Sequence, residues 1–161
     1  MLMGMIWVGY RRDDLTARQI LEDPEQLDEL LDSDDDENSV DIDKAWHALH
    51  WLLNDNGHPT DDSLSETIFG GESIGEDLGY GPGRLLPADR VRAVARALGQ
   101  IELNSLRTRM DARAMESAEI YPMIWDEDDV FDSYLAPAYD RLRRFYTAAA
   151  AANQAVIQTI C

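Results

Sequence analysis

The sequence predicts an α/β domain of three sandwiched layers, in which a small central sheet is covered by helices. Apolar, β-branched segments near the two ends of the chain, residues 3–10 and 155–160, are typical of buried strands. Between them, apolar residues recur at helical spacing. With 161 residues, of which 45% are hydrophobic, the chain suits one core, and we expect a single domain over residues 1–161.

Two short helices are expected after the first strand. Residues 15–21 have a short helical pattern, and a second helix starts at Asp23, the expected N-cap before Pro24. That helix ends in an aspartate-rich run, residues 32–38, which we interpret as a solvated loop.

A central amphipathic helix is expected over residues 41–53. Asp41 or Asp43 would provide its N-cap, and Gly57 is placed to end it. Its apolar face is formed by Ile42, Ala45, Trp46, Leu49, Leu52 and Leu53. Because the helix holds two of the three histidines and two of the four tryptophans, we expect any polar site near the core to use it.

The rest of the chain is expected to form helices around a glycine-rich segment. Residues 70–83 contain six glycines, which predict tight turns around a short strand, with a ligand-facing loop as the alternative. A strand should end at residues 84–86, and residues 119–125 should form an aromatic turn. The expected helices span residues 63–68, 87–99, 103–115 and about 130–152, the last with a kink at Pro137.

Acidic side chains dominate the first half of the chain. Residues 1–83 hold 21 acidic and 4 basic side chains, whereas residues 84–161 hold 11 and 10, and the net charge is −18. Such a charge repels phosphate backbones and anionic lipid and attracts basic partners. We therefore expect a protein partner with a basic surface, and neither nucleic acid nor membrane. Solubility alone is the alternative explanation of the charge.

The composition is also typical of a cytoplasmic protein. No apolar run approaches the ~18 residues that a membrane span needs. Residues 1–7 show neither a basic leader nor a small-residue cleavage site. The only cysteine is Cys161, so no internal disulfide or cysteine zinc site is expected.

The aspartate-rich loop is a candidate docking surface, made of Asp32, Asp34, Asp35, Asp36 and Glu37. Its place between two helices also invites comparison with an EF-hand, in which Asp32 takes position 1 and Asp43 the last position. However, Glu37 stands where the EF-hand turn needs glycine, and Asp43 is shorter than the usual bidentate glutamate. We therefore favour a solvated docking loop over a calcium site.

A weak metal-site alternative rests on Asp43, His47 and His50, which are spaced to share one face of the central helix. Carboxylate and imidazole ligands suit zinc or non-haem iron, but ligands from a single helix rarely complete a site. We therefore expect no metal and no cofactor.

A candidate polar pocket combines Asp43, Lys44, His50, Glu119 and Tyr121. If the aromatic turn approaches the central helix, a histidine, a glutamate and a tyrosine would line one pocket and support general acid–base chemistry. The simpler interpretation is a polar contact with no turnover, in which Lys44 or His50 pairs with Glu119.

Several segments taken together carry a family resemblance. They are residues 3–6, the D-x-D-K-x-W pattern from Asp41 with Leu49-His50, residues 70–87, and the Ile120-Tyr121-Pro122 element. In this combination the chain resembles the YfbM-like family of small, uncharacterised bacterial proteins over nearly its whole length. The resemblance implies an α/β sandwich and no established activity. His47 and the aspartate-rich loop depart from the family pattern.

We therefore expect an interaction protein that docks a basic partner through its acidic surface, as immunity proteins do with basic nuclease toxins by analogy. The alternative is a small hydrolase-like or small-molecule-binding enzyme with a pocket near His50, Glu119 and Tyr121.

Overall fold

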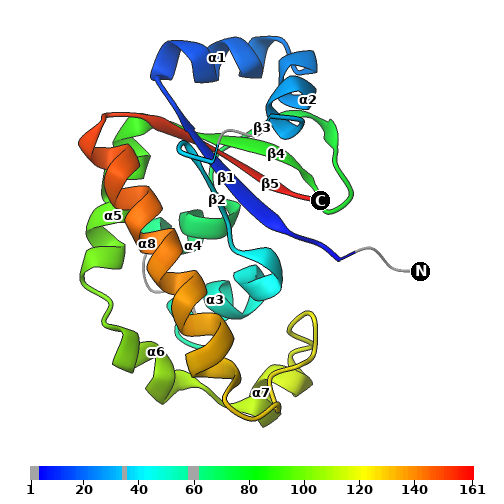
Figure 1. Ribbon diagram of the computed structural model, residues 1–161, viewed down its shortest axis with the longest axis vertical. Helices are drawn as coiled ribbons and strands as arrows, with labels where there is room; N and C mark the ends of the chain where they lie inside the picture. The colour runs from blue at the N-terminus through cyan, green and yellow to red at the C-terminus, as the bar shows by residue number, and fades with distance from the viewer. Residues whose placement is uncertain (1–3, 34–35, 58–61) are drawn as a thin grey trace.

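A five-stranded sheet separates two layers of helices in the computed structural model, which describes residues 4–33, 36–57 and 62–161 (Figure 1). The strand order is β2-β1-β5-β4-β3, and all neighbouring strands are antiparallel. The strands are β1 (Trp7–Arg12), β2 (Ser39–Asp41), β3 (Glu72–Asp77), β4 (Pro82–Leu86) and β5 (Ala155–Ile160). The predicted three-layer α/β architecture is confirmed.

The two helical layers are unequal. Helices α1 (Asp14–Glu22) and α2 (Glu25–Leu31) lie on one face of the sheet (Figure 1). The remaining helices lie on the other side; they are α3 (Trp46–Leu53), α4 (Asp62–Phe69), α5 (Ala88–Gly99), α6 (Leu103–Arg109), α7 (Ala112–Ser117) and α8 (Ala136–Ala151). Two separate apolar clusters result, a small one beneath α1 and α2 and a large one beneath the other helices. None of the described helices is both long and apolar enough to cross a membrane.

The C-terminal segment forms the middle strand of the sheet. All six residues of β5 are buried, and β5 pairs with β1 on one side and β4 on the other. Ala155 and Ile157 join the small cluster, whereas Val156 and Ile160 join the large one. Burial on both faces explains why this strand is a nearly continuous β-branched run.

The predicted central helix is shorter than expected. Residues Ser39–Asp41 form β2, where Asp41 pairs with Val8, and a 3-10 helix η1 (Asp43–Ala45) precedes α3. The Asp41 carboxylate accepts the backbone N–H of Asp43 at 2.7 Å, and Asp43 has a φ of +53°. This local turn separates the strand from the helix, so neither predicted N-cap precedes a continuous helix.

Three other predicted helix boundaries also change. The expected helix over 103–115 divides into α6 and α7, because the Asp111 carboxylate accepts the N–H of Ala114 and starts a new helix. Asp23 ends α1 by donating its N–H to Gln19, and α2 begins at Glu25. Pro137 lies in the first turn of α8, after a π-helical turn η2 (Phe131–Leu135), instead of kinking one long helix.

The glycine-rich segment forms the β3–β4 hairpin, as the tight-turn interpretation predicts. Gly71 has a φ of +107°, and a Cβ there would lie 2.4 Å from the carbonyl oxygen of Leu85. At the other end, the Asp77 carboxylate accepts the N–H groups of Gly79 at 2.6 Å and Gly81 at 3.2 Å. Both ends of the hairpin therefore depend on glycine.

Replacing Gly71 with alanine should lower the free energy of unfolding by about 2–4 kcal/mol, because the side chain meets backbone atoms in a left-handed conformation. Gly99→Ala is the control, since nothing lies within 4 Å of a Cβ there. It should leave the stability unchanged or raise it by up to about 1 kcal/mol. Urea titration followed by far-UV circular dichroism measures both, and equal losses in the two variants would refute the steric argument.

Candidate functional site

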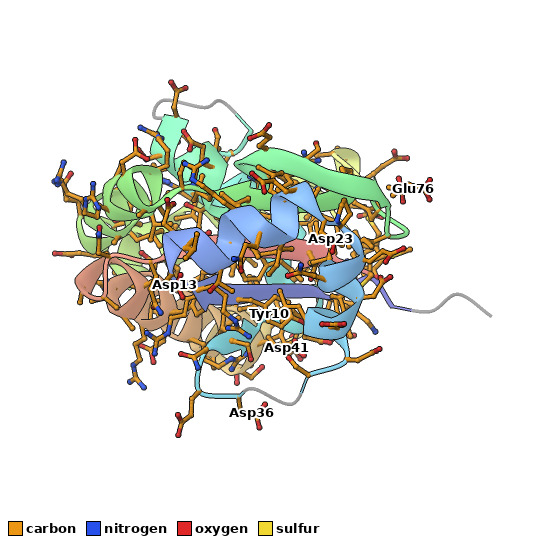
Figure 2. The ribbon with its side chains drawn as sticks, turned by 90° about the horizontal axis from the view of Figure 1, so that it is seen from above. Tyr10, Asp13, Asp23, Asp36, Asp41 and Glu76 are labelled. Atoms are coloured by element: carbon orange, nitrogen blue, oxygen red, sulfur yellow. The ribbon has the colours of Figure 1, made fainter. Side chains whose placement is uncertain are left out.

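Many exposed carboxylates lie on and around the layer of α1 and α2. The apolar side chains Ala17, Ile20, Leu27 and Leu30 point to the sheet, so the acidic residues of both helices face solvent. We define the acidic face by the exposed residues Asp13, Asp14, Glu22, Asp23, Glu25, Asp28, Glu29, Asp32, Asp36, Glu37, Asp41, Glu72, Glu76 and Asp77. Figure 2 shows five of them spread around this layer: Asp13, Asp23, Asp36, Asp41 and Glu76.

Few cations offset this charge. Arg18 pairs with Asp14 one helical turn away at 3.0 Å, in an exposed position. Arg11 instead reaches the amide of Gln154 at 3.0 Å and the backbone oxygen of Glu37 at 3.3 Å. The acidic face holds fourteen exposed carboxylates, whereas residues 1–83 hold only 4 basic side chains, so the face stays negative.

A groove opens in the acidic face between α2 and β3. It has a volume of about 510 Å³ and is lined by Pro24, Glu25, Leu27, Asp28, Ile74, Gly75, Glu76, Asp77 and Leu78. Leu27 and Ile74 are buried and form an apolar floor, and none of these lining residues is basic. Gly75 allows β3 to approach the start of α2 closely, because a Cβ at this position would lie 2.8 Å from the Cβ of Pro24. We name this feature the acidic groove.

The predicted docking loop forms only part of this surface. Asp32, Asp36 and Glu37 are exposed, whereas Asp34 and Asp35 lie outside the described residues. Sequence analysis missed α1, α2 and β3 as carriers of the acidic face. Their acidic residues at exposed helical positions, and the acids within the glycine-rich segment, were the available signal.

Two of the EF-hand donors are used within the fold. The carbonyl oxygen of Asn38, the seventh position, accepts the N–H of Arg11 at 2.8 Å. The carboxylate of Asp43, the last position, accepts the hydroxyl of Tyr134 at 2.7 Å. The described residues contain no cluster of three or more His, Cys, Asp or Glu side chains that can hold a metal ion.

Both described histidines on α3 accept hydrogen bonds through Nδ1. The backbone N–H of Tyr121 donates to His47 at 2.9 Å. The side-chain amide of Asn54 lies 3.3 Å from Nδ1 of His50, and Ser65 fixes that amide by donating to its oxygen. Each imidazole is therefore neutral and carries its proton on Nε2. Burial and, to a smaller extent, the neighbouring His47 lower the pKa of His50 to about 4, and burial also lowers the pKa of His47.

Aromatic rings surround these histidines. Trp46 is fully buried and stacks on His47 with ring centroids 5.2 Å apart. The rings of His50 and Phe69 meet in a T-shaped arrangement, with centroids 4.7 Å apart. Trp46 also contacts Phe69, Tyr80 and Tyr121. The histidines thus belong to the rim of the aromatic core.

The five residues of the predicted polar pocket divide into three groups. Asp43, Lys44 and Tyr121 gather near the N-terminal segment: Tyr134 donates to Asp43 and accepts the N–H of Lys44 at 2.9 Å, and the Tyr121 hydroxyl accepts the N–H of Met5 at 2.9 Å. His50 lies against Phe69 instead. Glu119 is exposed, in a left-handed turn with a φ of +55°.

Tyr134 holds the first of these groups together. Burial raises its pKa, and the hydrogen bond to Asp43 raises it further. A protonated hydroxyl at this position both donates to a carboxylate and accepts a backbone N–H, which fixes the turn that precedes α3. Asp43 is therefore held by η2 before α3 begins, which also removes it from the helix face that the metal hypothesis requires.

The sequence of residues 3–159 matches a protein family described as a domain of unknown function (DUF1877). The chain belongs to this family. The crystal structure of YfbM from Escherichia coli, described as a protein of unknown function, shares the fold with a TM-score of 0.75 and 21% sequence identity. The match covers 98% of this chain and 100% of YfbM. A comparison with curated proteins found no match. The predicted resemblance to YfbM-like proteins is thus confirmed.

For this member of the DUF1877 family, His50 should make stability depend on pH. Its pKa is about 4 when folded and about 6.5 when unfolded, so the unfolded chain binds more protons between these values. The contribution of neutral His50 to the free energy of unfolding is therefore complete above pH 6.5, and it is lost as the pH falls toward 4. From pH 7.5 to pH 5.0, we expect wild type to lose about 1–2 kcal/mol more than His50→Gln in urea unfolding.

Comparing wild type with His50→Gln removes the pH dependence that arises from carboxylates, because both proteins contain the same carboxylates. An equal pH dependence of wild type and His50→Gln would contradict the neutral, buried state of this imidazole.

Proposed function

We propose that the protein binds a partner with a basic surface and that the acidic groove is the centre of the binding surface. The observation that carries the proposal is the combination of four carboxylates, from Glu25, Asp28, Glu76 and Asp77, with an apolar floor in one groove. Lysine and arginine side chains match this combination, because their methylene stems pack on apolar surface while their charged ends meet carboxylates.

The distribution of charge supports the same proposal. The acidic face surrounds the groove, and its charge would increase the rate at which a basic partner arrives. Like charges that line one groove repel one another, which costs free energy in the unbound protein. A cationic partner would remove that cost, so the same residues would favour both encounter and binding.

The enzyme alternative receives less support from the geometry. Tyr121 uses its hydroxyl to hold Met5, and both histidines use Nδ1 within the fold. Glu119 is exposed on a turn. A general acid–base pair needs its members within hydrogen-bond reach of one reacting atom. We therefore place binding ahead of catalysis.

Neutralising the groove should weaken capture of the partner. The variant Glu25→Gln/Asp28→Asn/Glu76→Gln removes three carboxylates and leaves Asp77, which holds the hairpin turn. With the immobilised protein and a lysate of cells that produce it, we expect one dominant basic protein that elutes with salt. The triple variant should retain at least about tenfold less of it, because three carboxylates that would pair with the partner's cations are lost.

Two variants with the same change in charge serve as controls. Glu102→Gln/Glu116→Gln/Glu127→Gln alters exposed carboxylates outside the acidic face and should retain the partner. Asp32→Asn/Asp36→Asn/Glu37→Gln tests the predicted docking loop separately. If no basic protein is captured, or if all three variants lose it equally, then the groove is not the binding site.

A further inference from the structure

A second, smaller hollow lies on the opposite face of the sheet, beneath Tyr80. It is lined by Ile68, Phe69, Tyr80, Pro82, Arg84, Gln158 and Ile160. Its volume is about 10 Å³, which is room for one water molecule. Five of its seven lining residues are apolar or aromatic, and two polar side chains, from Arg84 and Gln158, complete it.

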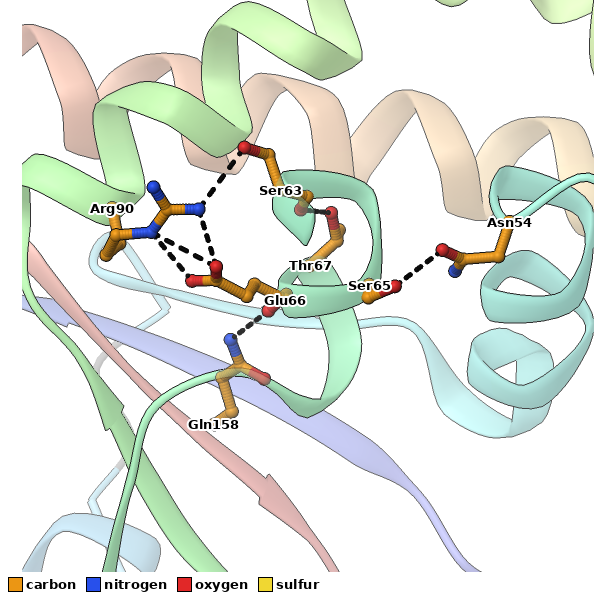
Figure 3. Close-up of polar contacts among 7 residues, drawn as sticks. All are labelled: Asn54, Ser63, Ser65, Glu66, Thr67, Arg90 and Gln158. Carbon is orange, nitrogen blue, oxygen red and sulfur yellow. Dashed lines mark hydrogen bonds and ion pairs between the residues drawn. The ribbon is translucent and has the colours of Figure 1, made fainter. Parts of the chain in front are cut away.

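The amide of Gln158 has a fixed orientation and an unused oxygen. Its Nε2 donates to the backbone oxygen of Glu66 at 3.0 Å (Figure 3). It also donates to the hydroxyl of Tyr146 at 3.0 Å. Tyr146 in turn donates to the backbone oxygen of Thr67 at 2.6 Å. Turning the amide over would break these bonds, so Oε1 must face away from them. Gln158 is only 2% exposed, and Oε1 accepts no hydrogen bond in the described structure.

An unused buried acceptor is unusual, because burial removes the water that would otherwise donate to it. Gln158 is the polar residue among the apolar inward-facing side chains of β5, next to Val156 and Ile160 in the same face. Packing does not require an amide there. A donor that enters the hollow would satisfy Oε1.

Arg84 supplies a cation beside this acceptor. Arg84 and Gln158 are register partners across β4 and β5, so their side chains share one face of the sheet. Within the described part of the chain, the guanidinium of Arg84 makes no ion pair. The neighbouring arginine, Arg90, is instead paired with Glu66 through three short contacts (Figure 3).

Tyr80 covers the hollow in a way that allows it to move. It is 50% exposed and rests on Trp46, with ring centroids 5.1 Å apart. It stands between Gly79 and Gly81, which have φ values of +129° and +89°. Glycine on both sides allows the backbone to change conformation once the hydrogen bonds from Gly79 and Gly81 to Asp77 loosen, and displacement of the ring would then enlarge the hollow.

We propose that the hollow beneath Tyr80 binds a small organic acid that carries a hydrogen-bond donor next to its carboxylate, such as an α-hydroxy acid. The carboxylate binds the planar guanidinium of Arg84, and the hydroxyl donates to Oε1 of Gln158. Fully ionised phosphate or sulfate offers only acceptors and leaves Oε1 unsatisfied. The apolar wall limits the ligand to a short carbon chain. This site shares no lining residue with the acidic groove.

The test is a titration of the isotope-labelled protein with glycolate, followed by two-dimensional NMR. We expect saturable shifts of the amides of Tyr80, Gly81, Arg84 and Gln158, including the Gln158 side-chain NH2. Acetate has the same charge but no hydroxyl, and it should bind at least about tenfold more weakly, because the buried acceptor stays unpaired. The absence of saturable shifts, or equal binding of acetate and glycolate, would overturn the proposal and leave the hollow as a site for one water.

Variants assign the binding to Arg84. Arg84→Gln should weaken glycolate binding at least about tenfold, whereas Arg92→Gln, on the exposed side of α5, should not change it. Far-UV circular dichroism checks that both variants fold. If Arg84→Gln does not fold, Arg84→Lys provides the same test, because lysine keeps the charge but lacks the planar fork. Equal affinity in the Arg84 and Arg92 variants would overturn the assignment.

Discussion

The pairing of β5 with β1 and β4 is the constraint on which the rest of the structure depends. Without β5, the sheet would divide into a β1–β2 pair and a β3–β4 hairpin, and isolated two-stranded units are marginally stable at best. The last strand of the chain thus joins the two halves of the sheet. Successive side chains of β5 point to opposite faces of the sheet. Ile157 therefore packs under α1 and α2, while Gln158 faces the larger helical layer.

This arrangement places the charge where the core is smallest. The acidic face lies over the small apolar cluster, whereas the tryptophans and both described histidines belong to the larger layer. Repulsion among the carboxylates therefore acts on the layer with the least apolar burial to resist it. Local opening should be easiest at α1 and α2, and a partner that binds there would stabilise the layer in proportion to its affinity.

The sequence allowed most elements to be predicted but not the way they meet. The end strands and the main helices follow from local periodicity, which needs no tertiary information. β2 could not be found in this way, since three residues become a strand only by pairing with β1. The break at Asp111 had a sequence signal, because aspartate is a common capping residue, but the prediction of one helix over 103–115 did not use it.

The candidate sites show the same limit. The exposed acids of α2 are readable from sequence, but the groove requires β3, more than 40 residues later, to approach through Gly75. Likewise, the neutral state of His47 follows from the backbone of Tyr121, which helix spacing does not reveal. For the hollow beneath Tyr80, the available signal was Gln158, a polar residue in a mostly apolar strand. Only the structure shows that its side-chain oxygen accepts no hydrogen bond.

The β3–β4 hairpin connects the two proposed sites. Leu78 lines the acidic groove and Tyr80 covers the hollow, and both belong to one turn, which Leu78 closes by donating its N–H to Gly81 at 2.9 Å. The Asp77 carboxylate lines the groove and also accepts the N–H groups of Gly79 and Gly81, on either side of Tyr80. A cation that draws this carboxylate into the groove would weaken its hold on the turn and so release Tyr80. Thermodynamic linkage is reciprocal. The factor by which a cation in the groove changes the affinity of the hollow for its ligand is also the factor by which that ligand changes the affinity of the groove for the cation.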